Sequence, residues 1–290
     1  MATSPQGVSY KDLSHFVNVD GLHIYARSWA PADQSKLRAV CLLLHGLAEH
    51  SGQYDRIAIP LTGCGVMVYA HDHLGHGQSE GDRIDIKDFN MYVRDSLQHV
   101  DIIKKKFPHL PIFLYGHSMG GTMVILAAME RPDQFAGVVA SAPAIKLNEK
   151  LALIASTQHT LDLNMEDLSR DPEENEKSET DPLAQFEAIK PGFVSQLLDI
   201  CLKIQPKISS IKCPFLALHG DADKVCDPQG SRMLMERAQS SDRKLVLYPG
   251  YYHDLHREPP QEAALVIRDI TSWIGTRLPE NPPKPDNCRQ

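Results

Sequence analysis

The sequence predicts an α/β protein whose mostly parallel central sheet is flanked by helices on both faces. Short, nearly continuous apolar runs recur along the chain, as expected for strands that are buried on both sides. Amphipathic stretches of helical period lie between these runs, and this alternation is typical of parallel sheets. With 290 residues, 42% of them hydrophobic, the chain is long enough to enclose a full core.

The predicted strands begin with a hairpin. Residues 15–29 contain two half-alternating segments that meet at Asp20-Gly21, a strong turn dipeptide. The later strands are predicted from the apolar runs 39–45, 66–71, 111–116, 137–141, 214–220 and 244–248. Helices are predicted over 89–103, where lysines follow the C-terminal end, and over 119–130, 229–240 and 260–276.

One segment, 144–204, interrupts the alternation because it contains no predicted strand. Apolar residues recur there every three to four positions over 147–168, and a second helical pattern over 183–202 contains the helix breaker Pro191. We therefore expect a helical cap inserted after the sixth strand, between the two parts of a catalytic domain, 10–143 and 205–276. The termini, 1–9 and 279–290, are expected to be flexible.

The composition argues against several classes of function. The 37 acidic residues outnumber the 30 basic ones, and the net charge of −7 argues against nucleic-acid binding. The 6 cysteines include no C-x-x-C pair, so neither a zinc knuckle nor a thioredoxin motif is supported, and a reducing, cytoplasmic location is expected. No apolar run is long enough to span a membrane, so any membrane contact is expected to be peripheral.

The strongest chemical signal is Gly116-His117-Ser118-Met119-Gly120-Gly121, a G-x-S-x-G motif between a predicted strand and a predicted helix. A nucleophile elbow requires this context, in which a sharp turn raises the serine hydroxyl above the edge of the sheet. We therefore predict that Ser118 is a catalytic nucleophile. The backbone N–H groups of Met119 and of Leu47, in the loop after the first apolar run, are expected to stabilise the oxyanion.

A serine nucleophile needs an acid and a base, which follow it in that order in folds of this kind. The loop after the seventh predicted strand offers Asp221 and Asp223, and we favour Asp223 because it lies clear of the strand end. Asp221 remains an alternative, and Asp227 suits the role less because Asp-Pro marks a helix start. The loop after the eighth strand offers His253 as the base, with His256 as its competitor. The acid would orient the base, which would take the serine proton.

Two groups of histidines invite a metal-binding interpretation, which we do not favour. The segment His71-Asp72-His73-Leu74-Gly75-His76 combines glycine with polar residues, as tight hydrogen-bonded loops do. His253 and His256 have H-x-x-H spacing, but clustered histidines alone do not define a ligand set. The sequence therefore predicts no metal.

These motifs resemble those of the monoacylglycerol lipase family of α/β-hydrolases. The resemblance rests on the segments that begin at His45 (HGLAEHSGQY), His71 (HDHLGHGQSEG), Gly116 (GHSMGG), Ala222 (ADKVCD) and Tyr252 (YHDLH). It implies an α/β-hydrolase fold and hydrolysis of monoacylglycerols to fatty acid and glycerol without a cofactor. It also implies that Glu49 and His256 lie near the glycerol-binding end and that Cys226 is a candidate reactive thiol near the site.

The cap is where the chain departs from this family. The family's glycerol-pocket tyrosine and an arginine after His-Ser-Gly are here Ser178 and Gln53. Residues 162–187 carry ten acidic and two basic side chains, so this segment has a net charge of −8 and the rest of the chain is nearly neutral. We expect weak membrane contact through the cap, because anionic lipids would repel it. Leu151 and Ile154 belong to the apolar stripe, which would either line an acyl-chain tunnel or pack onto the catalytic domain.

More than one function remains open. A serine esterase acting on monoacylglycerols is favoured, while a lysophospholipase or a broad carboxylesterase would use the same triad under a different cap. A non-catalytic lipid-binding protein on a hydrolase scaffold is the remote alternative, disfavoured because every candidate triad member is present. A lipid ester is the expected partner, and the sequence fits a monomer or a homodimer.

Overall fold

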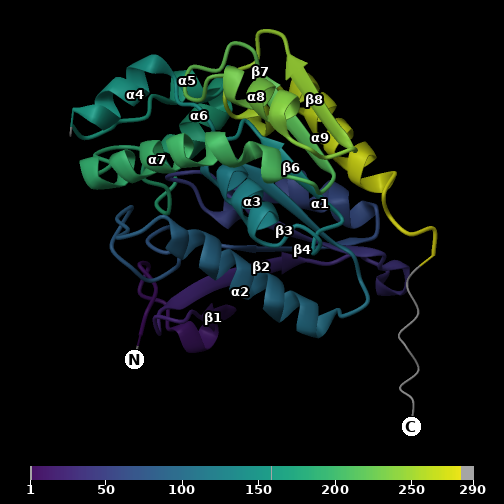
Figure 1. Cartoon of the computed structure of the whole chain (residues 1–290). Coiled ribbons are helices and arrows are strands. Elements are labelled where there is room, and N and C mark those ends of the chain that lie inside the picture. The colour runs from purple at the N-terminus through teal and green to yellow at the C-terminus, as the bar shows by residue number, and fades with distance from the viewer. Residues whose placement is uncertain (1, 158, 282–290) are drawn as a thin grey trace.

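The structure, a computed structural model, describes residues 2–157 and 159–281. Within these residues, eight strands form one sheet in the order β1-β2-β4-β3-β5-β6-β7-β8 (Figure 1). The pairs β1–β2 and β2–β4 are antiparallel, and all other neighbours are parallel, so the predicted α/β class is confirmed. The strands are β1 (His15–Val17), β2 (His23–Trp29), β3 (Ala39–Leu44), β4 (Val66–His71), β5 (Ile112–His117), β6 (Gly137–Ser141), β7 (Phe215–Gly220) and β8 (Arg243–Tyr248).

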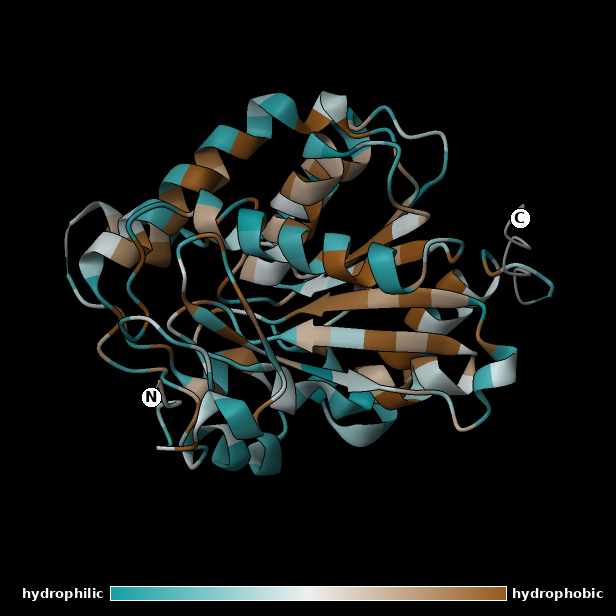
Figure 2. Cartoon of the chain, turned by 90° about the horizontal axis from the view of Figure 1, so that it is seen from below, coloured by the Kyte–Doolittle hydropathy of each residue, from teal (hydrophilic) through white to brown (hydrophobic). Residues whose placement is uncertain are grey.

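Helices cover both faces of the sheet because the central strands are apolar on both sides. In β3, Leu42 and Leu44 belong to one buried core, whereas Cys41 and Leu43 belong to the other. Figure 2 shows largely apolar strands next to helices in which hydrophilic and hydrophobic residues alternate. The first core is covered by α2 (Asn90–Lys106), α3 (Met119–Glu130) and α8 (Gln229–Arg237), and the second by α1 (Asp55–Gly63) and α9 (Pro260–Gly275).

Short 3-10 turns connect several of these elements. They are η1 (Tyr10–Asp12), η2 (Gln34–Lys36), η3 (Ser51–Tyr54), η4 (Gln205–Ser210) and η5 (Leu255–Arg257). The N-terminal residues, expected to be flexible, form a turn in which Thr3 pairs with Ser9. Most of the C-terminal segment expected to be flexible, residues 282–290, lies outside the described residues.

The predicted cap follows the sixth strand, as expected, and consists of α4 (Glu149–Ser156), α5 (Met165–Leu168), α6 (Pro172–Glu179) and α7 (Pro191–Ile204). The helix predicted over 183–202 in fact begins at Pro191, because proline lacks an N–H and fits the first turn of a helix. The apolar stripe over 147–168 is divided between α4 and α5. The segment between them pairs Leu161 with Ile189.

Two helices were not predicted from the sequence. The nine-residue α1 contains Pro60, which conceals its helical pattern, yet Ile57 and Leu61 are fully buried against the sheet. The acidic α6 has almost no apolar period. Its start is stabilised by Asp171, whose side chain accepts a hydrogen bond from the N–H of Glu173.

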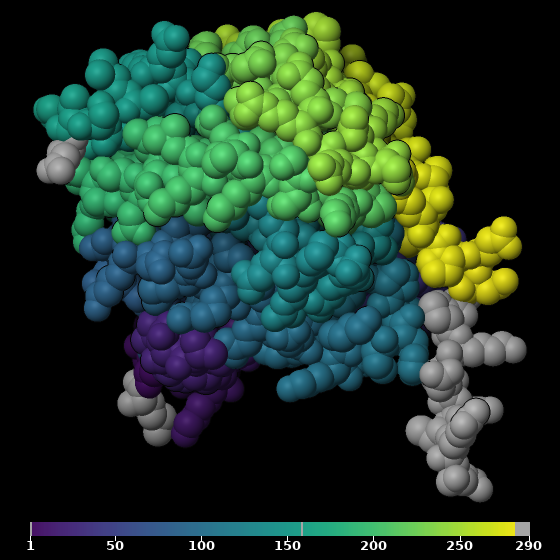
Figure 3. Space-filling model, in the orientation of Figure 1, coloured from purple at the N-terminus to yellow at the C-terminus, as the bar shows by residue number. Residues whose placement is uncertain are grey.

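Ion pairs hold the acidic cap against the rest of the molecule. Glu174 lies 2.8 Å from Arg56, and Asp181 lies 2.8 Å from His50. In the space-filling view, the green surface of α7 lies directly against the blue segment below it (Figure 3). At least the carboxylate of Glu174 is therefore paired with a cation of the catalytic domain and is not a free surface charge. No described helix is long and apolar enough to cross a membrane.

A cluster of buried histidines surrounds the loop that follows β4. His73 N donates to His45 Nε2 at 3.0 Å, and the Nδ1 atoms of His71 and His99 lie 3.1 Å apart. These rings and that of His76 are at most 4% exposed. Burial lowers the pKa of His73 and of His99 to about 3 and that of His76 to about 4.

Acid should therefore destabilise the fold well before the carboxylates titrate. At pH values between 6.5, the ordinary histidine pKa, and about 4, these histidines become protonated in the unfolded chain but stay neutral in the folded protein. Over this range, each such histidine should lower the free energy of unfolding by about 1.4 kcal/mol for every unit by which the pH falls. Urea unfolding at a series of pH values measures this slope. His99→Asn should make the slope shallower, whereas substitution of the exposed His159 should not; an equal effect of both variants would contradict the assignment.

Candidate active site

Ser118 stands alone between the end of β5 and the start of α3. Its backbone angles, φ 52° and ψ −116°, lie in a region that residues other than glycine rarely adopt. Such strain persists only where the surroundings impose it, and it is common at functional sites. The predicted sharp turn at the serine is therefore present.

Close backbone packing imposes this turn. A Cβ atom on Gly116 would lie 2.1 Å from the carbonyl oxygen of Gly120, and a Cβ on Gly120 would lie 2.2 Å from that of Leu44. Any larger residue at either position would push α3 away from β5 or from the end of β3. The glycines of the motif thus allow the serine to reach the edge of the sheet.

The structure brings together the predicted acid and base. His253 Nδ1 donates to Asp223 Oδ2 at 2.7 Å, and the other carboxylate oxygen, Oδ1, accepts from the N–H groups of Val225 and Cys226. Burial opposes charge on His253, but the Asp223 carboxylate raises its pKa above the ordinary value. In turn, the pKa of Asp223 is held well below its usual range despite burial, mainly by the charge of His253. This arrangement can orient an imidazole base and stabilise its cation.

The competing residues are engaged elsewhere. Asp221 accepts from the N–H of Gly250 at 2.6 Å, and Asp227 forms an ion pair with Lys146 at 2.6 Å. His256 is fully buried and stacks on Tyr54, with 4.9 Å between ring centroids. Among the predicted candidates, only Asp223 is therefore placed to act with His253.

Asp223 has a second imidazole partner that was not predicted from the sequence. His219 Nε2 lies 3.1 Å from Asp223 Oδ2, and its other nitrogen, Nδ1, lies 2.7 Å from Ser231 Oγ. Because the residue is in the buried strand β7, its pattern in the sequence is that of a core position. Only the fold shows that its ring helps to orient the acid.

Ser118 and His253 line the same cavity, although no hydrogen bond joins them within the described residues. The Ser118 hydroxyl interacts instead with the Cys226 thiol. Catalytic hydrogen bonds of this kind commonly tighten only when substrate binds. Burial, followed by the charge of Asp223, raises the pKa of Cys226 well above the ordinary value. Because the thiolate is the reactive form, this burial argues against the predicted reactivity of Cys226.

The predicted oxyanion donors are Met119, directly after Ser118, and Leu47, in a loop that lines the same cavity as the serine. Met119 is the first residue of α3, so its N–H has no partner inside the helix. Leu47 follows β3 in a loop that lines the cavity, and its N–H has no acceptor within the described residues. In the described part of the chain, neither N–H group therefore has a partner that would prevent it from acting as an oxyanion donor.

The cavity around Ser118 is apolar and narrow. Leu151, Leu161 and Leu168 of the cap line it together with Val225. Most of the side chains that line it are aliphatic, so the cavity suits an apolar ligand. Leu151 thus has the predicted position.

Ile154, which was also predicted to bind substrate, is not among the residues that line this cavity. It packs against the main apolar core from the same helix as Leu151, α4. The side chains of residues three apart lie near one another on a helix, but they need not meet the same neighbours. The periodicity of the stripe therefore identified burial, whereas only the cap's packing decides which residues face the cavity.

The two residues expected at the glycerol-binding end differ in their placement. Glu49 lines the cavity, and its Oε2 accepts from the N–H of Gly46 at 2.7 Å and from the hydroxyl of Tyr54. His256 is not among the cavity-lining residues, because η5 turns its ring inward against Tyr54. Its predicted contact with substrate is therefore not supported.

Arg257 is the polar residue at this end that was not predicted. It is 4% exposed and donates to Ser178 Oγ at 2.8 Å and to Gln53 Oε1 at 2.6 Å. It also lies 3.3 Å from Glu49. The guanidinium therefore joins the two positions at which the sequence departs from the family. In the sequence, the only sign that Arg257 belongs to this site is its position directly after the segment that contains His253.

Several known proteins resemble this chain over most of its length. Residues 35–260 match the family described as "Serine aminopeptidase, S33". Monoglyceride lipase of Mus musculus is 41% identical over 287 residues, covering 95% of this chain and 94% of that protein. A solved monoacylglycerol lipase from Paleococcus ferrophilus has a TM-score of 0.76 at 30% identity, covering 88% of this chain and 99% of that one. A soluble variant of Saccharomyces cerevisiae monoglyceride lipase shares the fold, with a TM-score of 0.83 at 21% identity and coverage of 96% and 97%.

The strain at residue 118 can be measured with two inactive variants. Ser118→Gly relieves the positive φ, whereas Ser118→Ala retains it, so the glycine variant should be the more stable by about 1 kcal/mol. Neither variant should react with a fluorophosphonate probe. Chemical denaturation of both proteins gives the comparison. A more stable alanine variant would show that the turn is unstrained.

The proposed base also makes a prediction about pH. Because the general base must be neutral, kcat/KM should rise with pH, with its midpoint above 6.5, the ordinary histidine pKa. The midpoint is displaced upward because the pKa of His253 is raised, which keeps the ring protonated to higher pH. Initial rates should be recorded where circular dichroism shows a folded protein. A midpoint below 6.5 in that range would contradict the assignment.

Proposed function

Since this chain belongs to the monoglyceride lipase family of α/β-hydrolases, we propose that it is a serine esterase that cleaves monoacylglycerols to fatty acid and glycerol. One observation carries this proposal: a strained serine and an Asp-paired histidine line the same apolar cavity. The family resemblance supplies the substrate class, and the cavity supplies a place for its acyl chain.

Acylation follows from the positions of these groups. Ser118 Oγ attacks the ester carbonyl carbon while His253 Nε2 takes the hydroxyl proton. Negative charge develops on the carbonyl oxygen, where the N–H groups of Leu47 and Met119 stabilise it. The C–O bond to glycerol then breaks, and the imidazolium returns the proton to the leaving alkoxide. An acyl-enzyme ester and free glycerol result.

Deacylation repeats these steps with water. His253 removes a proton from a water molecule, whose oxygen attacks the acyl carbon, and the same N–H groups stabilise the second oxyanion. Collapse of this intermediate returns the proton to Ser118 Oγ and releases the fatty acid. Throughout the cycle, Asp223 remains ionised, holds the imidazole by Nδ1, and stabilises its positive charge. No cofactor enters any step.

The charge of the cavity favours a neutral head group. Glu49 and Asp254 line the cavity together with Ser118. Carboxylates in a poorly hydrated site repel a phosphate group, whereas glycerol hydroxyls can donate hydrogen bonds to them. We therefore place a monoacylglycerol ahead of a lysophospholipid. A broad carboxylesterase with the same triad remains the second candidate, favoured by the narrowness of the cavity.

We also propose that contact with membranes is peripheral, weak and made through the cap. Leu153 of α4 and Leu202 of α7 are exposed apolar side chains on cap helices. The many carboxylates of the cap oppose binding to anionic lipid, although Glu174, which is paired with Arg56, contributes less repulsion. A cytoplasmic location agrees with the absence of a disulfide among the described cysteines.

A substrate profile tests the proposed function. Purified protein should hydrolyse 2-oleoylglycerol with a kcat/KM at least about tenfold above that for p-nitrophenyl acetate or lysophosphatidylcholine. Of the three, only 2-oleoylglycerol combines a long acyl chain for the apolar cavity with a neutral hydroxyl head group for the carboxylates. Fatty acid release is measured for all three under identical conditions. Ser118→Ala serves as the inactive control. Equal or faster turnover of either competitor would assign the enzyme to the corresponding esterase class.

A further inference from the structure

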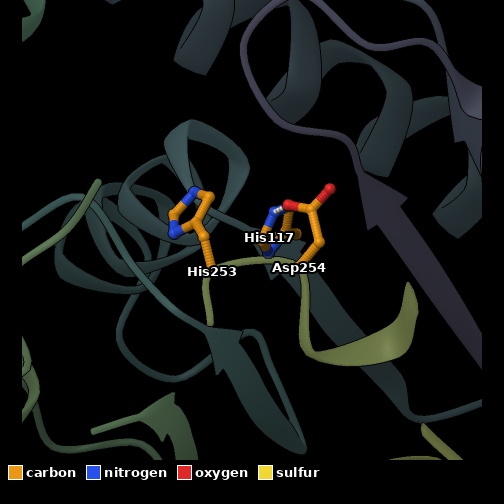
Figure 4. Close-up of side chains that lie close together, drawn as sticks. All are labelled: His117, His253 and Asp254. Atoms are coloured by element: carbon orange, nitrogen blue, oxygen red, sulfur yellow. Dashed lines mark hydrogen bonds and ion pairs between the residues drawn. The ribbon is translucent and has the colours of Figure 1, made fainter. Parts of the chain in front are cut away.

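A second histidine–aspartate pair lies beside the candidate triad. His117 directly precedes Ser118 in the chain, and Asp254 directly follows His253. His117 Nε2 lies 2.9 Å from Asp254 Oδ1, and both side chains are buried. The rings of His117 and His253 are 4.8 Å apart, measured between centroids (Figure 4). The reaction sequence above uses neither His117 nor Asp254.

The side chains of His117, His253 and Asp254 converge at the cavity. One donor atom from each residue lies within 4.8 Å of the other two. All three residues line the cavity, so a small ion that enters it can reach them. His253 offers Nε2, because its Nδ1 is bound to Asp223. Within the described residues, His117 Nδ1 has no hydrogen-bond partner and can therefore accept a proton displaced from Nε2.

The buried carboxylates around this cluster exceed the buried cations. Glu49, Asp223 and Asp254 are each less than a tenth exposed. Within the described residues, Arg257 is the one guanidinium that reaches them, 3.3 Å from Glu49 and 3.4 Å from Asp254. With the imidazoles neutral, three carboxylates against one guanidinium leave two negative charges in a poorly hydrated site. Such a site favours a divalent cation.

The donor set selects the kind of cation. Two imidazole nitrogens and one carboxylate oxygen are a common protein ligand set for zinc, with a fourth position left for water. Magnesium and calcium prefer oxygen ligands, so this set disfavours them. We propose that His117, His253 and Asp254 bind a divalent transition-metal ion such as Zn²⁺ and that the bound ion inhibits the hydrolase.

Inhibition follows from the atom that the ion occupies. When His253 Nε2 donates its lone pair to the metal, it can no longer accept the proton of Ser118. For His117 Nε2 to bind the ion, the proton that it shares with Asp254 must leave. This proton moves to Nδ1 of the same ring, so the His117–Asp254 pair neither gains nor loses a proton. This inhibitory consequence rests on the proposed role of His253, whereas the binding of the ion does not.

Zinc binding is measured first, without turnover. Calorimetric titration of the full chain with zinc chloride should give one site, and Asp254→Asn and His117→Gln should each weaken its affinity by about tenfold or more. The exposed His159 provides the matched control, because His159→Asn should leave the affinity unchanged. Thermal melting shows whether each variant is folded. Unchanged affinity in either folded variant of the pair would overturn the site.

Inhibition is then measured with a p-nitrophenyl ester, so that the outcome does not depend on the natural substrate. Zinc should inhibit the wild-type enzyme, a chelator should restore the rate, and Asp254→Asn should need about tenfold more zinc for half-inhibition of its own basal rate. Equal inhibition by magnesium, or equal sensitivity of this variant, would overturn the proposal. Zinc binding to a protein that hydrolyses no ester would instead contradict the proposed function and leave the metal site standing.

Discussion

Close packing of backbone around Ser118 is the constraint on which the rest of the site depends. Gly120 lies so near the carbonyl oxygen of Leu44 that α3, β5 and the end of β3 meet without intervening side chains. This contact imposes the strained conformation of Ser118 and places the N–H of Met119 near the loop that carries Leu47. The proposed oxyanion site needs donors whose positions are set before the reaction, and backbone packed in this way is suited to fix them.

A second feature of the site is its buried polar network. Asp223 and Asp254 each pair with an imidazole, and Arg257 links the latter carboxylate to Glu49. Charges removed from water are costly unless they are paired, so these residues restrict one another's positions. The network also extends to the cap through Ser178, which accepts from Arg257. Cap position and the polarity of the catalytic end are therefore physically connected.

Patterns in the chain predicted the sheet and pointed to the side chains of the candidate triad because both have local causes. Apolar runs predict buried strands, and the glycines around Ser118 reflect a turn that only small residues permit. The cap was predicted less accurately. A periodic stripe indicates a buried face without identifying its neighbour, so Leu151 reached the cavity wall and Ile154 did not. Likewise, the charge count of the cap could not reveal which of its carboxylates pair with Arg56 or His50.

By itself, the sequence determined the α/β class, the insertion of a cap, and the identities of Ser118 and His253 as the residues to examine. It favoured Asp223 as the acid but left Asp221 as an alternative and Asp227 as a weaker one, because all three follow the same strand. Only the tertiary structure decided that Asp223 reaches the imidazole while Asp221 binds a nearby N–H. The position of His117 beside Asp254 is likewise visible only in the tertiary structure. Such contacts join segments far apart in the chain, and their distances depend on how the whole sheet is assembled.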